Sequence, residues 1–207
     1  MIRPLYNLYH NLFVKHPKPS TINRSGIILS DHPVIGNGWI KGWLVDADKK
    51  DTIIVCKHSN PSILPPNNTV FATSNTGVKH YRTIVSVETV ELKDYDLDIT
   101  ICKLDKPFPK DIHAYKFAEK LQEGQYTITF NNSNEKSEAN LKLMSKSGQV
   151  AGNNRKLQFI GGDSGTPWFV WEKDEWRVAS HTHRGMYGIG PWYSHKELYA
   201  LLKKVVD

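Results

Sequence analysis

Cysteine is scarce in this 207-residue chain, which contains only Cys56 and Cys102. Two cysteines form at most one disulfide, so the chain is not a small secreted fold held together by several bridges. Long apolar runs are also missing. No window approaches the roughly 20 apolar residues that span a bilayer, and residues 1–14 lack the continuous apolar core of a secretory signal. We therefore expect a cytoplasmic or virion-associated protein whose two thiols are buried and unpaired.

Massed charge of one sign is absent as well. The net charge is +6, and the Lys and Arg residues are scattered along the sequence. A basic surface favours anionic polymers, but no nucleic-acid-binding motif accompanies this one. We therefore expect neither a nucleic acid nor a membrane as partner. The contents of 39% hydrophobic and 11% aromatic residues are sufficient for the core of one domain, or of one pair of tightly packed barrels.

Short segments with strand-like patterning follow one another from Gly26 onward. Alternating or β-branched apolar residues are interrupted by turn-forming residues, and a sustained helical pattern appears only near the ends of the chain. Many short strands of this kind predict an all-β sandwich or barrel. The expected strands are 26–30, 38–46, 51–57, 69–73, 80–90, 98–104, 124–131, 138–149, 155–160, 167–172, 175–181 and 186–193.

The two ends of the chain carry helical patterns. Residues 1–14 place apolar groups at helical spacing, which predicts an N-terminal helix or arm over residues 1–24 that packs on the body. The alternative is that residues 1–14 dock onto a partner. At the other end, Ser194 and Glu197 have the spacing of a capping box, and an apolar face follows them, so a helix is expected over residues 194–207.

The segment Gly161–Pro167, with the sequence GGDSGTP, is the most distinctive in the chain. Glycines on both sides of Ser164 permit a tight turn that exposes its hydroxyl. The N–H groups of Gly162, Asp163 and Ser164 would then face one point, as an oxyanion hole requires. A serine hydroxyl is a weak nucleophile, so this interpretation also requires a histidine and an acid upstream.

Both groups are present in suitable contexts. The β-branched run of residues 51–57 ends at His58, and an alternating strand follows Asp98. Each has alternatives. His80 is the nearest rival of His58, although it follows a Gly-containing turn rather than a buried strand, and Asp94 and Asp96 are rivals of Asp98, although neither is expected to open the strand.

The GDSG segment, together with the chain order His58, Asp98, Ser164, resembles the chymotrypsin-like (trypsin-fold) serine peptidases, in particular the compact bacterial and viral ones. The resemblance covers the chain from residue 34 to the C-terminus. It implies two six-stranded antiparallel Greek-key barrels, over residues 25–110 and 111–193, followed by the C-terminal helix. The first barrel would carry His58 and Asp98 and the second Ser164.

What the resemblance implies for function is a serine endopeptidase that acts on proteins or polypeptides through an acyl-enzyme and needs no cofactor. His58 would be the general base and Asp98 the residue that orients it. Protein maturation in a virus or bacterium is the expected setting. Two departures from the family pattern separate the chain from the secreted trypsin branch: Thr166 replaces a common glycine, and Ser59 follows the histidine where the family has cysteine.

Specificity is expected from the strand beyond Ser164. In the family, a histidine on that strand serves members that cut after Glu or Gln, so we expect His181, or His183 in its place, to bind the substrate side chain. Gln158, at the base of the pocket by motif offset, argues against cleavage after Lys or Arg. The His-x-His pair could also be half of a metal site, but no third ligand has suitable spacing, so we expect no metal.

Two other classes of function remain open. One is a virion or scaffold protein that retains the fold for a structural role and docks through residues 1–14. The other is a peptide-binding module that captures a segment by strand addition without cutting it. The presence of all three triad residues favours the enzyme, because neither alternative requires them together.

Overall fold

The computed structural model of the protein describes residues 17–34, 38–63, 65, 67–131, 135–152, 162–183 and 188–206. Several expectations lie outside these residues: the arm of residues 1–14, the strand at 155–160, and the side chain of Gln158.

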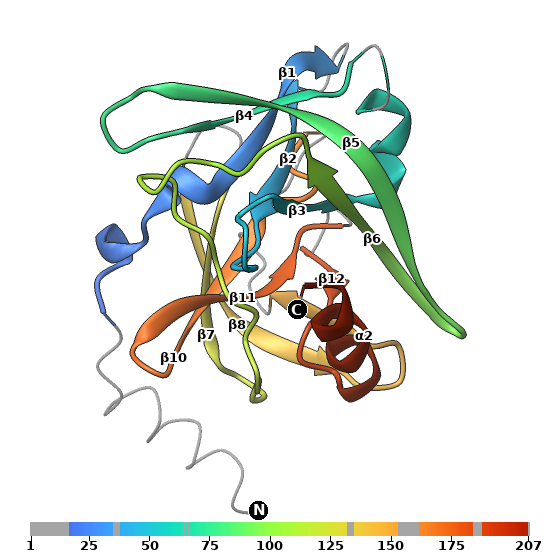
Figure 1. Cartoon of the computed structure of the whole chain (residues 1–207). Helices are drawn as coiled ribbons and strands as arrows, with labels where there is room; N and C mark the ends of the chain where they lie inside the picture. The colour runs from blue at the N-terminus through green and yellow to red at the C-terminus, as the bar shows by residue number, and fades with distance from the viewer. Residues whose placement is uncertain are drawn as a thin grey trace, which may run out of the picture.

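Six antiparallel strands in the first half of the chain form a closed barrel in the order β1-β2-β3-β6-β5-β4 (Figure 1). Their bounds are β1 Ile27–Val34, β2 Gly38–Leu44, β3 Thr52–Cys56, β4 Thr69–Thr73, β5 Lys79–Leu92 and β6 Tyr95–Leu104. All six were expected from the sequence. Their interior residues are mostly aliphatic, as in Ile53 and Val55 of β3 and Leu104 of β6.

The second half of the chain forms another six-stranded antiparallel sheet, in the order β11-β10-β7-β8-β9-β12. Its strands are β7 Tyr126–Phe130, β8 Lys136–Met144, β9 Gln149–Gly152, β10 Pro167–Glu172, β11 Glu175–His181 and β12 Gly190–Pro191. The expected fold class, two six-stranded antiparallel units with a C-terminal helix, is therefore confirmed. The first unit is a closed barrel and the second a half-barrel.

One expected strand was wrong in detail. Residues 138–149 form two antiparallel strands, β8 and β9, which a turn at residues 145–148 separates. Gly148 has a φ of +60° in this turn, and a Cβ there would lie 2.8 Å from the Tyr95 ring. A glycine in the left-handed region lets the chain reverse where a continuous strand was expected.

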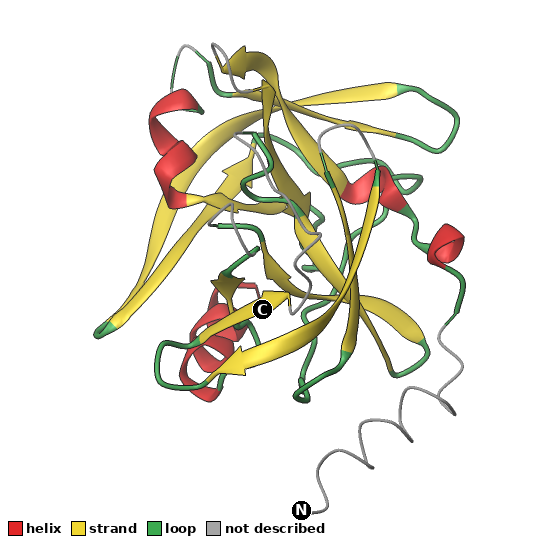
Figure 2. Ribbon diagram, turned by 180° about the vertical axis from the view of Figure 1, so that it is seen from behind, coloured by secondary structure: helices red, strands yellow, loops and turns green. Residues whose placement is uncertain are grey.

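The two sheets pack against each other, as the view from behind in Figure 2 shows, and a shared aromatic core joins them. Trp43 of β2, Tyr115 of the connecting segment, Phe169 of β10 and Tyr193 belong to one buried cluster. The connecting segment passes between the sheets: the Tyr115 N–H donates to the Leu44 carbonyl at 2.9 Å. The sheets are thus packed as one body around the segment that links them.

The C-terminal helix α2 spans Lys196–Val206 and buries Leu198 and Leu202 against the shared core. The helix was expected, and it begins two residues after Ser194. The Ser194 hydroxyl accepts a hydrogen bond from the Trp192 indole at 2.8 Å.

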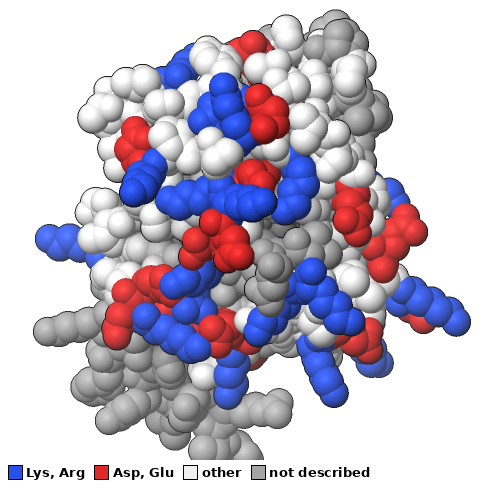
Figure 3. All heavy atoms as spheres, in the orientation of Figure 1, with Lys and Arg blue, Asp and Glu red and all other residues white. Residues whose placement is uncertain are grey.

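Three short 3-10 turns complete the described elements: η1 Pro19–Thr21, η2 Arg24–Gly26 and η3 Lys57–Ser62. Both cysteines are buried and free, as expected. No helix in the described part of the chain is long and apolar enough to cross a membrane. On the face drawn in Figure 3, basic and acidic side chains are interspersed, in line with the scattered charge of the sequence.

Candidate active site

His58 follows directly after a strand that is buried along its whole length. All five residues of β3 are buried, and the chain then turns into η3, which begins at Lys57. The turn brings the imidazole to the surface, where the side chain is 49% exposed. The β-branched residues of β3 therefore fix the backbone while leaving the ring accessible to a ligand.

Asp98 lies inside β6, not at its entrance as the sequence suggested. The strand begins at Tyr95, and its pairing with β5 is irregular between Val90 and Leu92, which pair with Ile99 and Tyr95. Asp98 itself has a φ of +50°, a conformation that costs a residue with a Cβ about 1–3 kcal/mol. This irregularity is a β-bulge, and it interrupts the alternation of side chains between the two faces of β6 at the buried Asp98 carboxylate.

His58 and Asp98 form a two-point hydrogen-bonded pair. His58 Nδ1 lies 2.6 Å from Asp98 Oδ2, and the His58 backbone N–H donates to Oδ1 at 2.8 Å. The hydrogen bond that His58 donates to Asp98 raises the pKa of His58, although burial acts in the opposite direction. Burial tends to raise the pKa of Asp98, but the hydrogen bonds from His58 outweigh it and lower this pKa. Asp98 is therefore a carboxylate that holds the Nδ1–H tautomer, which leaves Nε2 as the basic nitrogen.

A second imidazole lies against the same carboxylate. His183 Nε2 is 3.4 Å from Asp98 Oδ2, and the His183 ring stacks on that of His58 with a centroid distance of 6.2 Å. The side chain of His183 is only 11% exposed. This position places His183 beside Asp98, and the substrate contact expected of it stays a prediction.

Ser164 occupies a turn between two glycines in the left-handed region. Gly162 has a φ of +92° and Gly165 a φ of +83°. A Cβ on Gly165 would lie 1.9 Å from the Lys41 carbonyl oxygen, so both its conformation and the available space require glycine. Within the described part of the chain, the N–H groups of Gly162 and Ser164 donate to no protein acceptor.

The Thr182 carbonyl connects the serine turn to the histidine segment. It accepts hydrogen bonds from the Gly165 N–H at 2.8 Å and from the Cys56 thiol at 3.4 Å. Cys56 lies two residues before His58, and Gly165 directly follows Ser164. The three predicted triad residues thus belong to one connected site, although no hydrogen bond joins Ser164 to His58 among the described residues. Such bonds are often long in the absence of substrate.

Asp163, beside the serine, has a cationic neighbour that the sequence did not suggest. Lys41 Nζ of β2 lies 3.8 Å from Asp163 Oδ1, and the two side chains are only 8% and 1% exposed. Burial lowers the pKa of Lys41 to about 8, and the charge of Asp163 limits this decrease. Lys41 therefore supplies the partner that a buried carboxylate requires.

His181 is fully buried and faces the shared core. Its Nδ1 is hydrogen-bonded to the Tyr193 hydroxyl. Burial lowers the pKa of His181 to about 4, although the charge of Asp98 acts against the decrease, so the ring is neutral at pH 7. The substrate contact expected of His181 stays a prediction.

One group of side chains has the composition of a metal site. Ligand atoms of Cys56, His58 and Asp98 lie within 4.8 Å of one another. Burial, followed by the nearby Asp98 charge, raises the pKa of the Cys56 thiol well above its usual value. Because metals bind the thiolate, and Asp98 already engages His58 through both oxygens, the arrangement favours a histidine–carboxylate pair over a metal site.

The fold and site together define a two-sheet β protein in which a His–Asp pair and a Gly-Asp-Ser-Gly turn meet at one place. This arrangement is compatible with the chymotrypsin-like fold. No protein-family model matches the chain, and no match is found among curated proteins.

Proposed function

We propose that this protein is a serine endopeptidase that uses Ser164, His58 and Asp98. The single observation that carries the proposal is the His58–Asp98 pair, with its 2.6 Å hydrogen bond to a carboxylate that is 6% exposed. A general base of this kind needs a fixed tautomer and an accessible second nitrogen, and His58 has both.

The roles follow from the chemistry of acyl transfer. His58 Nε2 removes the proton from Ser164 Oγ as that oxygen attacks the carbonyl carbon, and it returns the proton to the leaving amine. Asp98 stays ionised and offsets the positive charge of the imidazolium. Water then attacks the acyl-enzyme with the same base, which releases the new carboxyl terminus and restores Ser164.

The developing oxyanion needs donors that are already in place. The N–H groups of Gly162 and Ser164 meet this requirement, since they have no acceptor among the described residues. Donors of this kind typically contribute about 3–4 kcal/mol each to transition-state stabilisation. Asp163 contributes the intervening backbone, and its pairing with Lys41 restrains the turn.

The proposal covers the reaction but assigns no preferred substrate side chain. A preference for Glu or Gln depended on His181 and His183, and these rings pack on Tyr193 and Asp98 respectively. Maturation of viral or bacterial proteins remains the setting that the resemblance suggests.

A second candidate is a scaffold or peptide-binding protein built on this fold. The observation that favours it is that Ser164 and His58 are not hydrogen-bonded to each other in the described site. A binding cleft would retain the surface of the site without requiring that contact.

Labelling with a fluorophosphonate probe distinguishes the two functions. We expect stoichiometric labelling of the folded protein at Ser164 and its loss in Ser164→Ala and His58→Ala, with Ser137→Ala of β8 as the matched control that still labels. Circular dichroism would show that each variant is folded. A folded wild-type protein that does not label would reject the peptidase and leave the binding or scaffold function.

A further inference from the structure

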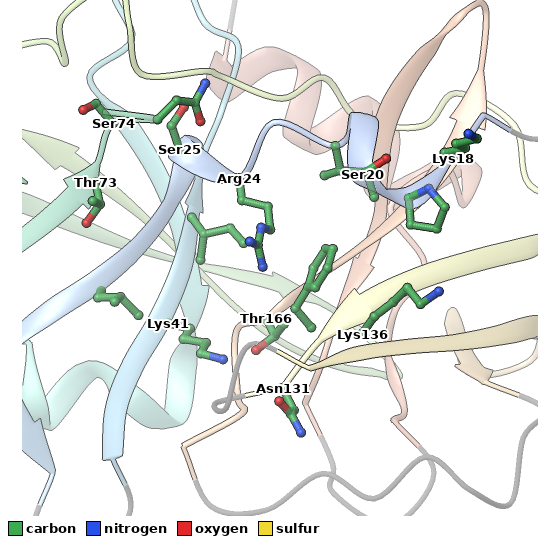
Figure 4. Close-up of a pocket in the computed structure, with 16 residues that line it drawn as sticks. Lys18, Ser20, Arg24, Ser25, Lys41, Thr73, Ser74, Asn131, Lys136 and Thr166 are labelled. Atoms are coloured by element: carbon green, nitrogen blue, oxygen red, sulfur yellow. The ribbon is translucent and has the colours of Figure 1, made fainter. Parts of the chain in front are cut away.

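Lys41 of the Lys41–Asp163 pair also lines a cavity of about 1180 Å³. Sixteen residues line it, contributed by the segment that precedes β1, by β1 and β2, by the β4–β5 turn, and by β7, β8 and the start of β10 (Figure 4). It therefore lies between the first barrel and the second sheet, and residues 17–29 form one of its walls.

The charges around this cavity have one sign. Four of the sixteen lining residues are cationic, and none is Asp or Glu; the cations are Lys18, Arg24, Lys41 and Lys136. A concave surface that carries only positive charge concentrates anions.

Two of these cations have contacts at the wall. The Arg24 guanidinium lies over the Phe130 ring at 5.0 Å. Lys136 pairs with Glu138, but both side chains are more than 40% exposed. An exposed pair of this kind contributes only about 0–1 kcal/mol and can rearrange around a ligand.

Two polar residues that line the cavity, Lys41 and Thr166, are buried. Thr166 is 1% exposed, and its Oγ1 has no hydrogen-bond partner in the described structure. Lys41 is its neighbour, because the Lys41 carbonyl packs against Gly165. A buried hydroxyl without a partner costs about 1–3 kcal/mol, so it needs an explanation such as a ligand.

Lys41 can serve such a ligand and Asp163 together. The 3.8 Å ion pair is longer than a hydrogen bond, and an ammonium group has three donors. Asp163 itself does not line the cavity. Figure 4 shows Lys41 and Thr166 at the same side of the cavity, with Arg24 near them.

We propose that this cavity is a binding site for a small molecule that carries a phosphate or carboxylate group, with Lys41 and Thr166 as its anion receptor. The rest of the molecule lies against the apolar wall formed by Ile27, Leu29 and Phe130. The volume accommodates more than an inorganic ion, since drug-sized ligands occupy sites of roughly 300–1,000 Å³. Ser164 does not line the cavity, so this proposal does not rest on the proposed peptidase activity.

Calorimetric titration of the full chain with inorganic phosphate tests the proposal, with sodium chloride at matched ionic strength as the blank. We expect saturable one-to-one binding to the wild type. Thr166→Val removes the hydroxyl at constant shape and should weaken binding about tenfold or more, since hydrogen bonds to charged groups are the stronger kind. The thermal midpoint without phosphate should not fall, because a hydroxyl without a partner is being removed.

Thr100→Val is the matched control. Thr100 is also fully buried with an Oγ1 that lacks a partner, but it lies in β6 and does not line the cavity. Its phosphate affinity should equal that of the wild type. Absence of binding at millimolar phosphate, unchanged affinity in Thr166→Val, or an equal loss in Thr100→Val would each overturn the proposal.

Phenyl phosphate distinguishes the source of the anion. It has the same charged group as inorganic phosphate together with an apolar body that can reach the wall at Phe130. Tighter binding than inorganic phosphate would identify an organic anion as the natural ligand, and equal binding would identify free phosphate. Both results require the loss in Thr166→Val.

Discussion

Replacing Lys41 by methionine should destabilise the protein severely, although the change keeps the length and apolar stem of the side chain. Two unit charges 3.8 Å apart attract by about 4 kcal/mol at an effective dielectric of about 20. The substitution costs stability because the Asp163 carboxylate, which is 1% exposed, loses its Lys41 partner. Removing one partner of a buried pair typically costs about 3–5 kcal/mol, a large part of the 5–15 kcal/mol that stabilises a domain.

Thermal and urea unfolding measure this loss. For a chain of this size, the expected shift of the thermal midpoint is on the order of 10 °C. Lys57→Met is the control: Lys57 Nζ is only 2.8 Å from Glu91, closer than in the buried pair, but both side chains are at least half exposed. Its effect should be small, because burial rather than distance decides the outcome.

The double variant Lys41→Met/Asp163→Asn measures the coupling energy between Lys41 and Asp163. Removing both charges should restore part of the stability, so the double variant should lose less than the sum of the single variants, with a coupling of about 0.5–3 kcal/mol. If Lys41→Met unfolds like the wild type, or if the two single losses simply add, then the pair does not hold Asp163 in the turn and the argument is refuted.

Two further predictions concern activity and backbone. The proposed peptidase should lose activity at low pH as His58 becomes protonated. Because Asp98 raises the pKa of His58, Asp98→Asn should move the acid limb of the pH–rate profile to lower pH and reduce kcat on the order of 10⁴-fold. An acid limb that does not move would show that Asp98 does not orient His58. Gly165→Ala should unfold the turn or abolish labelling. The control Gly77→Ala, at a φ of +85° with open space around it, should lose only the left-handed penalty of about 1–2 kcal/mol. Equal losses of stability in the two variants, measured by denaturant titration, would show that the contact with the Lys41 carbonyl is unimportant.

Much of the fold could be predicted from local patterns. Strand β3 is a β-branched run that is buried throughout, and β10 and β11 have the bounds expected from the sequence. The reversal at Gly148 was missed although Ser145, Ser147 and Gly148 are turn-forming residues. The entrance of β6 was misplaced because Asp98 has a left-handed conformation at the bulge and two hydrogen bonds with His58, which lies in η3 and is distant in sequence.

In the candidate site, too, local sequence patterns indicate some of the residues and not others. His58, Asp98 and Ser164 could be named because each is flanked by a recognisable local segment. Lys41 could not, since nothing in the sequence around β2 indicates that its side chain turns inward to Asp163. The direction of His181 and His183 was also inaccessible, because it depends on contacts with Tyr193 and Asp98 that are distant in sequence.

The relative position of His58 and Ser164 depends on a residue that takes no part in the proposed chemistry. The Thr182 carbonyl receives donors from both segments, Gly165 beside the serine and Cys56 beside the histidine. Thr182 is fixed in turn by the Trp168 indole, which donates to its hydroxyl at 2.9 Å. A shift at the end of β11 therefore changes the distance between base and nucleophile without altering either residue. Since displacements of about 1 Å can cost about 10²-fold in rate, the end of β11 is as important to the proposed reaction as the triad itself.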